Sequence, residues 1–103
     1  MAKRLIWAPV ARLQLREIIY YWNSHNQSTT YTKKLRKHLR SVLKLVSYYP
    51  EIGKRTTYPN NKVRAKSFMD NFLIIYRVDP NKIIILNFWD NRQDPETNIY
   101  LKK

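Results

Sequence analysis

The sequence predicts an α+β fold in which a short N-terminal strand leads into a helical hairpin packed on a small, twisted antiparallel sheet. Two stretches in the first half carry apolar residues at helical spacing, and the second half contains apolar runs separated by short turns. The chain has 103 residues and shows neither a repeat nor a linker, so we expect residues 1–103 to form one domain.

The first predicted elements are a strand and a helix. RLIW at positions 4–7 is short, apolar and β-prone, and Pro9 suits the first turn of a helix. A helical stripe of apolar residues follows, made of Ala11, Leu15, Ile18, Ile19 and Trp22. The polar run NSHNQS at positions 23–28 predicts the turn that ends this helix.

The second predicted helix begins near Ser28 or Thr29, either of which suits an N-cap. Its apolar stripe consists of Leu35, Leu39, Val42, Leu43, Val46 and Tyr49. The helix is expected to end in YYPEIGKR, positions 48–55, because Pro50 cannot continue a helix. Gly53, the single glycine of the chain, is expected to take a positive φ there.

The remainder of the chain predicts an antiparallel meander. The alternation in KVRAKSF (62–68) and the apolar runs FLIIYRV (72–78) and KIIILNFW (82–89) are typical of strands. MDN at 69–71 and DPNK at 79–82 predict the turns between them, the second of type I. Such short connections join neighbouring antiparallel strands, so these three strands should be adjacent in the sheet.

Charge is the most unusual property of the composition. Twenty Lys and Arg stand against seven Asp and Glu, which gives a formal net charge of +13. A small domain with so large a positive charge favours an acidic partner such as RNA, DNA or an acidic protein. The chain has no cysteine, no apolar segment long enough to span a membrane and no signal-peptide pattern. We therefore expect a cytoplasmic protein without disulfides or membrane contact.

Several classes of site are excluded by the residues present. His25 and His38 are the two histidines, and neither lies near a cluster of acidic residues, so we expect no metal site. Their spacing also disfavours a ribonuclease that uses a pair of histidines. Nucleotide-binding loops need several glycines and the chain has one. No cofactor is therefore expected.

Cations in the predicted sheet are the candidate catalytic groups. Arg64 and Lys66 share one strand face because side chains alternate, and Arg92, after the last strand, could converge on them. Such cations bind phosphates or stabilise the charge that develops in phosphoryl transfer. Tyr100 would stack on a base or transfer a proton. The alternatives are that the two strand cations form a solvated face and that Tyr100 is a packing residue.

The segment FWDNRQDP, positions 88–95, offers a structural alternative for Arg92. Asp90 and Asp94 flank it, and a carboxylate paired with the guanidinium would neutralise that cation and shape a turn. A catalytic Arg92 must instead point towards the other two cations with its guanidinium free.

The polar side of the second predicted helix is strongly basic. It carries Lys33, Lys34, Arg36, Lys37, Arg40 and Lys44, with no acidic residue to pair them. Neighbouring like charges on a helix repel each other by a few tenths of a kcal/mol per pair, so their retention favours an anionic ligand over a merely solvated face. The candidate RNA-binding residues are Lys33, Lys37, Arg40, Lys44 and Arg77.

Four segments together resemble the RelE/ParE superfamily of toxins from type II toxin–antitoxin modules, and the resemblance covers nearly the whole chain. WAPVARLQLREIIYYW resembles the start of the first helix in that family, and LRKHLRSVLKLVSYYPEIGKR its second helix with the P-x-x-G turn of ParE-like members. VRAKSFMDNFLIIYRV resembles the paired core strands, and IIILNFWDNRQDP the last strand with its basic extension.

The resemblance implies a toxin that a cognate antitoxin protein neutralises, with the complex binding operator DNA. It also implies a helical hairpin on a small antiparallel sheet. A segment of the antitoxin, extended or helical, would wrap the toxin, and a strongly basic toxin would attract an acidic or amphipathic segment.

The superfamily divides by target. RelE-like members cleave mRNA in the ribosome with Lys, Arg and Tyr, whereas ParE-like members inhibit DNA gyrase without that set. Arg64, Lys66, Arg92 and Tyr100 match the RelE-like positions, but Leu73 stands where RelE-like enzymes carry a further Arg. Losing one such contact commonly costs ~10²–10³ in rate.

We expect metal-independent, ribosome-dependent mRNA cleavage from the retained cations. The first alternative is inhibition of gyrase through the helical hairpin and the C-terminal segment, and the second is a non-toxic basic module that binds nucleic acid.

Overall fold

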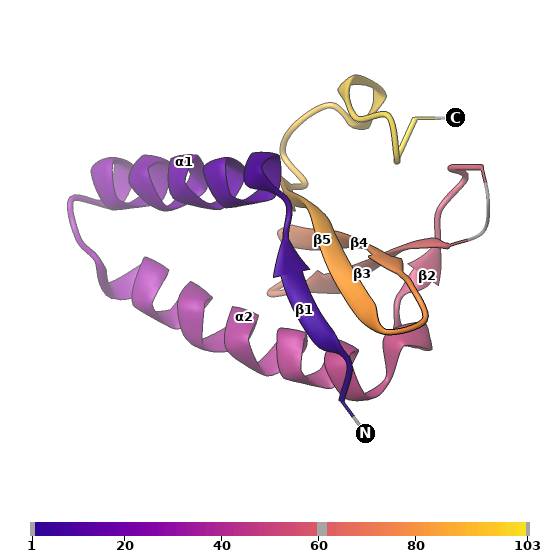
Figure 1. Ribbon diagram of the computed structural model, residues 1–103. Helices are drawn as coiled ribbons and strands as arrows, with labels where there is room; N and C mark the ends of the chain where they lie inside the picture. Colours follow the sequence, from indigo (N-terminus) through magenta and orange to yellow (C-terminus); the bar gives the residue numbers. More distant parts are fainter. Residues whose placement is uncertain (1, 60–61, 103) are drawn as a thin grey trace.

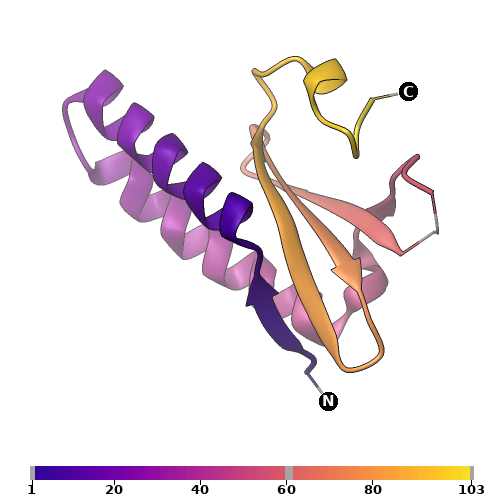
Figure 2. The same cartoon turned by 45° about the horizontal axis from the view of Figure 1, so that its top comes forward.

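The computed structural model describes residues 2–59 and 62–102. In that part of the chain two helices cover one face of a five-stranded sheet, and the C-terminal segment lies on the opposite side (Figures 1 and 2). The element order is β1 (Arg4–Trp7), α1 (Pro9–Asn26), α2 (Thr30–Tyr48), η1 (Pro50–Ile52), β2 (Lys54–Arg55), β3 (Val63–Phe68), β4 (Phe72–Val78), β5 (Lys82–Asp90) and η2 (Pro95–Thr97). The α+β fold with a helical hairpin on a small sheet is confirmed.

The sheet is mixed, which corrects the expectation of a purely antiparallel one. Its strand order is β1-β5-β4-β3-β2, and the predicted meander of β3, β4 and β5 is antiparallel throughout. β1 instead pairs parallel with β5, from Arg4 opposite Lys82 to Trp7 opposite Ile85. β4 pairs with one edge of β5, and β1 occupies the other edge. The local sequence of β5 does not specify which distant segment pairs there, so this parallel pairing was not predicted.

α1 extends four residues past its predicted end. Asn23 to Asn26 are helical, and the helix ends at Gln27, whose φ of 51° is left-handed and whose N–H reaches the carbonyls of Asn23 and Ser24. The Asn23 side chain accepts a hydrogen bond from the Thr32 hydroxyl of α2. Polar residues that were predicted to form a turn therefore continue α1, and one of them links α1 to α2.

α2 buries most of the predicted stripe against the sheet, and Leu43 is partly buried there. Leu35, Leu39, Val42 and Val46 are buried. Tyr49 is 65% exposed, so its assignment to the stripe was wrong, because it lies past the end of the helix. Thr29 is the N-cap position, and Ser28 Oγ accepts from the Thr30 N–H at 3.1 Å.

The core lies between the hairpin and the sheet. β4 and β5, two of the three strands with neighbours on both sides, contribute most of the sheet's share: Phe72, Ile74, Tyr76, Ile83, Ile85 and Phe88. These side chains pack with the buried stripes of both helices. Because directly opposed residues in an antiparallel pair share a face, this cluster identifies the helix-facing side of β3 as well. None of the described helices is long and apolar enough to cross a membrane.

Gly53 is required for a reason different from the predicted one. Its φ is −73°, so no left-handed conformation is involved. A Cβ at this position would lie 2.5 Å from the Tyr76 hydroxyl oxygen and 3.0 Å from the Ala65 carbonyl oxygen. The Gly53 N–H donates to that hydroxyl at 2.9 Å, and the hydroxyl donates to the Pro50 carbonyl at 2.7 Å. Glycine thus allows the backbone to approach Tyr76 closely.

Candidate functional site

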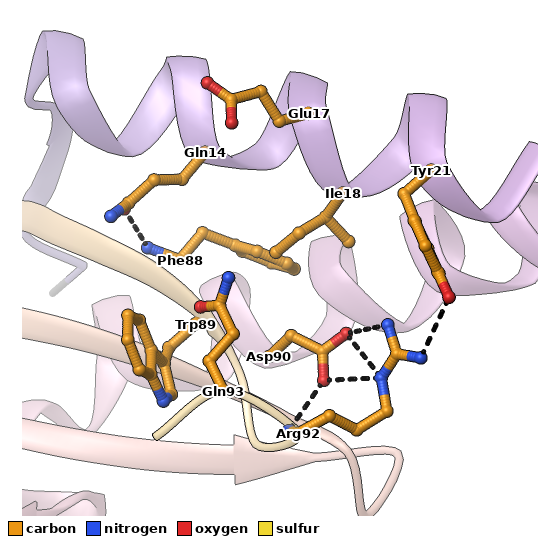
Figure 3. A pocket seen from close by; sticks show the side chains of 9 residues that line it. All are labelled: Gln14, Glu17, Ile18, Tyr21, Phe88, Trp89, Asp90, Arg92 and Gln93. Carbon is orange, nitrogen blue, oxygen red and sulfur yellow. Dashed lines mark hydrogen bonds and ion pairs between the residues drawn. The ribbon is translucent and has the colours of Figure 1, made fainter. Parts of the chain in front are cut away.

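Arg92 is held by Asp90, at the end of β5 (Figure 3). Its Nη2 lies 3.0 Å from Asp90 Oδ2, and its Nε lies 3.2 Å from both carboxylate oxygens. The backbone N–H of Arg92 also donates to Asp90 Oδ1 at 3.0 Å. Asp90 is 2% exposed, so the carboxylate depends on these donors. Arg92 is thus a hydrogen-bond donor to a buried carboxylate, as in the alternative in which Asp90 pairs with Arg92 and shapes the turn.

Two aromatic side chains of α1 complete the surroundings of Arg92. The guanidinium carbon lies 4.4 Å from the ring centre of Trp22 and 4.8 Å from that of Tyr21, and Nη1 donates to the Tyr21 hydroxyl at 3.3 Å. The hydrogen bonds to Asp90 and then to Tyr21 raise the pKa of Arg92 well above its usual range. The charge of the guanidinium is therefore already paired with a carboxylate.

A hollow of about 580 Å³ opens between α1 and the end of β5 beside this pair. It is lined by Gln14, Glu17, Ile18, Tyr21, Phe88, Trp89, Asp90, Arg92 and Gln93 (Figure 3). Gln14 Oε1 accepts from the Phe88 N–H at 2.9 Å and so fastens α1 to β5. Two carboxylates and one guanidinium line the hollow, which gives it a formal charge of −1 and makes it a poor seat for a phosphate.

Arg64 and Lys66 share one face of β3, as predicted. Arg64 lies opposite Tyr76 and Lys66 opposite Ile74, both of which face the helices, so the two cations lie on the helix-facing side. Arg64 Nη1 donates to the carbonyl oxygens of Glu51 at 3.1 Å and Gly53 at 2.8 Å. This arginine joins η1 to the sheet.

Arg92 does not converge on Arg64. Arg64 lies opposite Tyr76 of β4, whereas Asp90, to which Arg92 is bound, lies opposite Phe72. A four-residue offset corresponds to about 13 Å along the strands, and two strand spacings add about 10 Å across them. Arg92 instead packs on the aromatic side chains of α1. The structure therefore places these two predicted catalytic cations apart.

The remaining predicted groups lie on or near the other face of the sheet. Leu73 pairs with Ser67, and Arg77 with Val63, on the side away from the helices. Arg77 forms a bidentate ion pair with Asp79, at 3.0 and 3.1 Å.

Tyr100 belongs to the C-terminal segment, which covers the same side of the sheet (Figure 2). Its ring packs against that of Tyr58 at 4.8 Å between centres, and burial raises the pKa of its hydroxyl. Asn98, two residues earlier, is buried and donates to Asn87 Oδ1 at 2.9 Å, which anchors the segment to β5.

Sequence reasoning missed several residues around the hollow. Gln14, Glu17 and Tyr21 were not singled out, although Tyr21 and Trp22 form a polar-tipped aromatic pair at the end of a predicted helix, which is a detectable signal. Asp90 was considered only as a possible partner of Arg92. In the described part of the chain no group of three His, Cys, Asp or Glu residues is arranged to hold a metal ion.

A family model and a solved structure both relate this chain to toxin–antitoxin proteins. Residues 5–95 match the model of a family described as "ParE toxin of type II toxin-antitoxin system, parDE". A solved structure entitled "Chromosomal ParDE TA system from P. aeruginosa" matches with a TM-score of 0.67 and 19% identity, over 86% of this chain and 96% of that one. At that identity the likeness establishes the fold. No curated protein sequence matches the chain significantly.

Proposed function

This chain belongs to the ParE toxin family of type II toxin–antitoxin systems, and from that membership we propose that it inhibits DNA gyrase by binding, without cleaving RNA. The proposal selects the ParE-like alternative over the mRNA cleavage that the retained cations favoured. Gyrase is the target that the resemblance to ParE-like toxins implies.

One observation carries the proposal: Arg92 lies apart from Arg64, and most of the candidate catalytic groups are already bound. Arg92 is occupied by Asp90 and Arg64 by two backbone carbonyls, while Tyr100 packs on Tyr58. Catalysis of phosphoryl transfer needs several preorganised donors within hydrogen-bond distance of one developing charge. Leu73 also lacks the charge that RelE-like enzymes carry at its position.

The partner of the toxin is a cognate antitoxin, as membership in a toxin–antitoxin family implies. We propose that the complex binds its operator DNA, as the resemblance suggests. The outward side of α1 exposes large apolar side chains that suit a protein partner, namely Val10, Leu13, Tyr20 and Tyr21.

Ribosome-dependent mRNA cleavage remains the second candidate because of one feature. Arg64 and Lys66 lie two residues apart on a single strand face, as a pair of phosphate-binding cations requires. In this reading Lys66, whose side chain makes no hydrogen bond or ion pair to a described residue, is the group that contacts RNA.

Two parallel assays decide between the candidates. The purified chain is titrated into a gyrase supercoiling reaction, and into a translation reaction whose mRNA is mapped for cuts by primer extension. We expect supercoiling to stop at toxin concentrations comparable to that of gyrase, and we expect no ribosome-dependent cuts. Unimpeded supercoiling at a large molar excess of folded toxin would contradict the proposal.

Matched variants sharpen the comparison. Lys66→Ala and Tyr100→Phe remove the two candidate catalytic groups with the fewest contacts to the fold. Both variants should inhibit gyrase as the parent chain does. If the parent chain cuts mRNA and these variants do not, the second candidate replaces the first.

A further inference from the structure

The outward side of α2 is a continuous stripe of four cations. We name Lys33, Lys37, Arg40 and Lys44 the α2 stripe; all four side chains are exposed. At about 100° per residue they fall within an arc of about 60° on the helix surface. The stripe spans about 16 Å at 1.5 Å per residue, so consecutive charges are about 5–6 Å apart along the axis.

The charges of the stripe have no counterpart within the described part of the chain. α2 contains no Asp or Glu, and none of the four side chains makes a hydrogen bond or ion pair to another described residue. The described ion pairs are Arg77–Asp79 and Arg92–Asp90, which lie on other elements. Spacing of this kind on a helix is repulsive, by a few tenths of a kcal/mol for each close pair, and a bound polyanion would reverse that cost.

A second basic feature adjoins the stripe. A hollow of about 280 Å³ lies between the two helices, and three of its six lining residues are arginines: Arg12 and Arg16 from α1 and Arg36 from α2. The other three, Trp7, Leu15 and Ile19, are apolar, so no carboxylate lines this hollow. We name it the arginine hollow. Guanidinium groups that converge without an acid are typical of phosphate binding.

The surroundings of the stripe indicate which polyanion suits it. Proteins that bind single strands combine cations with aromatic side chains on which bases stack. Tyr48, one turn beyond Lys44, is the exposed aromatic residue of α2, so an aromatic ring lies at one end of the stripe and none lies between its four cations. Tyr31, the other aromatic residue of α2, packs against Trp22. A helix that binds a membrane surface offers an apolar face to the lipid, but the apolar face of α2 is buried in the core. A straight row of cations with no aromatic ring between them fits the backbone of a duplex better than a strand whose bases must stack.

We propose that the α2 stripe and the arginine hollow bind the sugar–phosphate backbone of duplex DNA. The contact is electrostatic and independent of base sequence, because phosphate contacts carry no sequence information. It goes beyond inhibition of gyrase, since it concerns a different surface and a different ligand. DNA binding by the α2 stripe is measured separately from gyrase inhibition, so either proposal can be wrong without the other.

The test measures binding of the purified chain to a short fluorescent DNA duplex as the NaCl concentration is varied. The logarithm of the association constant falls linearly with the logarithm of the salt concentration, with a slope of about −0.9 for each phosphate neutralised. Substituting the four stripe residues by Gln should reduce the magnitude of this slope by ~3–4. Arg12→Gln, Arg16→Gln and Arg36→Gln together should reduce it by a further ~2–3.

A charge-matched control separates the stripe from overall basicity. Gln at four exposed cations elsewhere, Arg4, Lys54, Arg55 and Lys102, removes the same number of charges. This variant should keep most of the wild-type slope. If it loses as much slope as the stripe variant, binding is a diffuse effect of net charge and the proposal is wrong.

Two further ligands test the identity of the polyanion. The same titration is run with a single-stranded RNA of equal length and with vesicles of phosphatidylglycerol and phosphatidylcholine. The duplex should bind more tightly than either ligand, and only its affinity should depend strongly on the stripe. Tighter binding of the RNA or of the vesicles through the stripe would overturn the assignment to DNA.

Discussion

At the scale of single residues, Arg92 shows how a basic side chain can be a structural group. Asp90 is almost fully buried, and a buried carboxylate without donors is costly. Arg92 supplies both a backbone and a side-chain donor to it, while the aromatic rings of Tyr21 and Trp22 flank the guanidinium. The end of β5 is thereby linked to α1.

Replacing Arg92 by Ala should lower the free energy of unfolding by about 1–3 kcal/mol, because it leaves the Asp90 carboxylate short of donors. Urea denaturation followed by circular dichroism measures the change. Arg12→Ala is the matched control: Arg12 is exposed and makes no ion pair to a described residue, so its removal should change stability by less than about 0.5 kcal/mol.

The double variant Asp90→Asn/Arg92→Ala tests the pairing itself. Its loss should be smaller than the sum of the two single losses, because each single change strands the remaining partner. Additive losses would show that Arg92 is independent of Asp90. In that case its guanidinium becomes available again to a phosphate.

At the scale of elements, the junction of η1, β3 and β4 depends on one hydroxyl group. The Tyr76 hydroxyl donates to the Pro50 carbonyl and accepts from the Gly53 N–H, and Arg64 donates to the Gly53 carbonyl. The turn after α2 is therefore fixed to the sheet by side chains.

Gly53→Ala should lower the free energy of unfolding by about 1–3 kcal/mol, since the added Cβ meets the Tyr76 hydroxyl and the Ala65 carbonyl. Urea denaturation measures this as well. Adding Tyr76→Phe removes the first of these clashes, so the double variant should lose less than the sum of the two single losses. Fully additive losses would contradict the described approach of the backbone to Tyr76.

The same hydroxyl predicts a dependence on pH. Burial raises the pKa of Tyr76 above its ordinary value of 10.0. Because the folded pKa exceeds the unfolded one, the associated stability is complete below about pH 10 and is lost as the pH rises through the folded pKa. The free energy of unfolding of the wild type should therefore fall more steeply above about pH 10 than that of Tyr76→Phe. Parallel slopes for the two proteins would exclude this origin.

Elements with local signals were predictable, and pairings between distant segments were not. β4 has the predicted bounds of 72–78 because a dense apolar run lies between two turns. β2, by contrast, is two polar residues, Lys54 and Arg55, whose strand geometry comes from pairing with β3. The shared face of Arg64 and Lys66 followed from alternation alone. The carbonyl partners of Arg64 lie on η1, and no pattern in β3 specifies them.

At the scale of the whole molecule, charge is unevenly distributed. The net charge is +13, and α2 carries six cations and no acid. Like charges that are close in the native state repel one another more than in an expanded unfolded chain. Repulsion between these cations therefore lowers the free energy of unfolding of the isolated chain.

Raising NaCl from about 20 mM to about 300 mM should screen this repulsion and increase the melting temperature. A recovery of about 1 kcal/mol corresponds to roughly 4–8 °C in a chain of this size. Thermal melts followed by circular dichroism measure it. The melting temperature of the stripe variant should rise less with NaCl than that of the wild type. Equal increases would show that the repulsion arises from cations outside the stripe.

The parallel pairing of β1 with β5 also has a consequence in time. β1 is synthesised about 80 residues before its partner strand, which at 5–20 residues per second is a delay of roughly 4–16 s. During that delay α1 and α2 lack most of the sheet on which they pack. A chain released before β5 is complete cannot close its core, so premature termination yields no native toxin. The native toxin therefore forms only after β5, the strand that pairs with β1, has been synthesised.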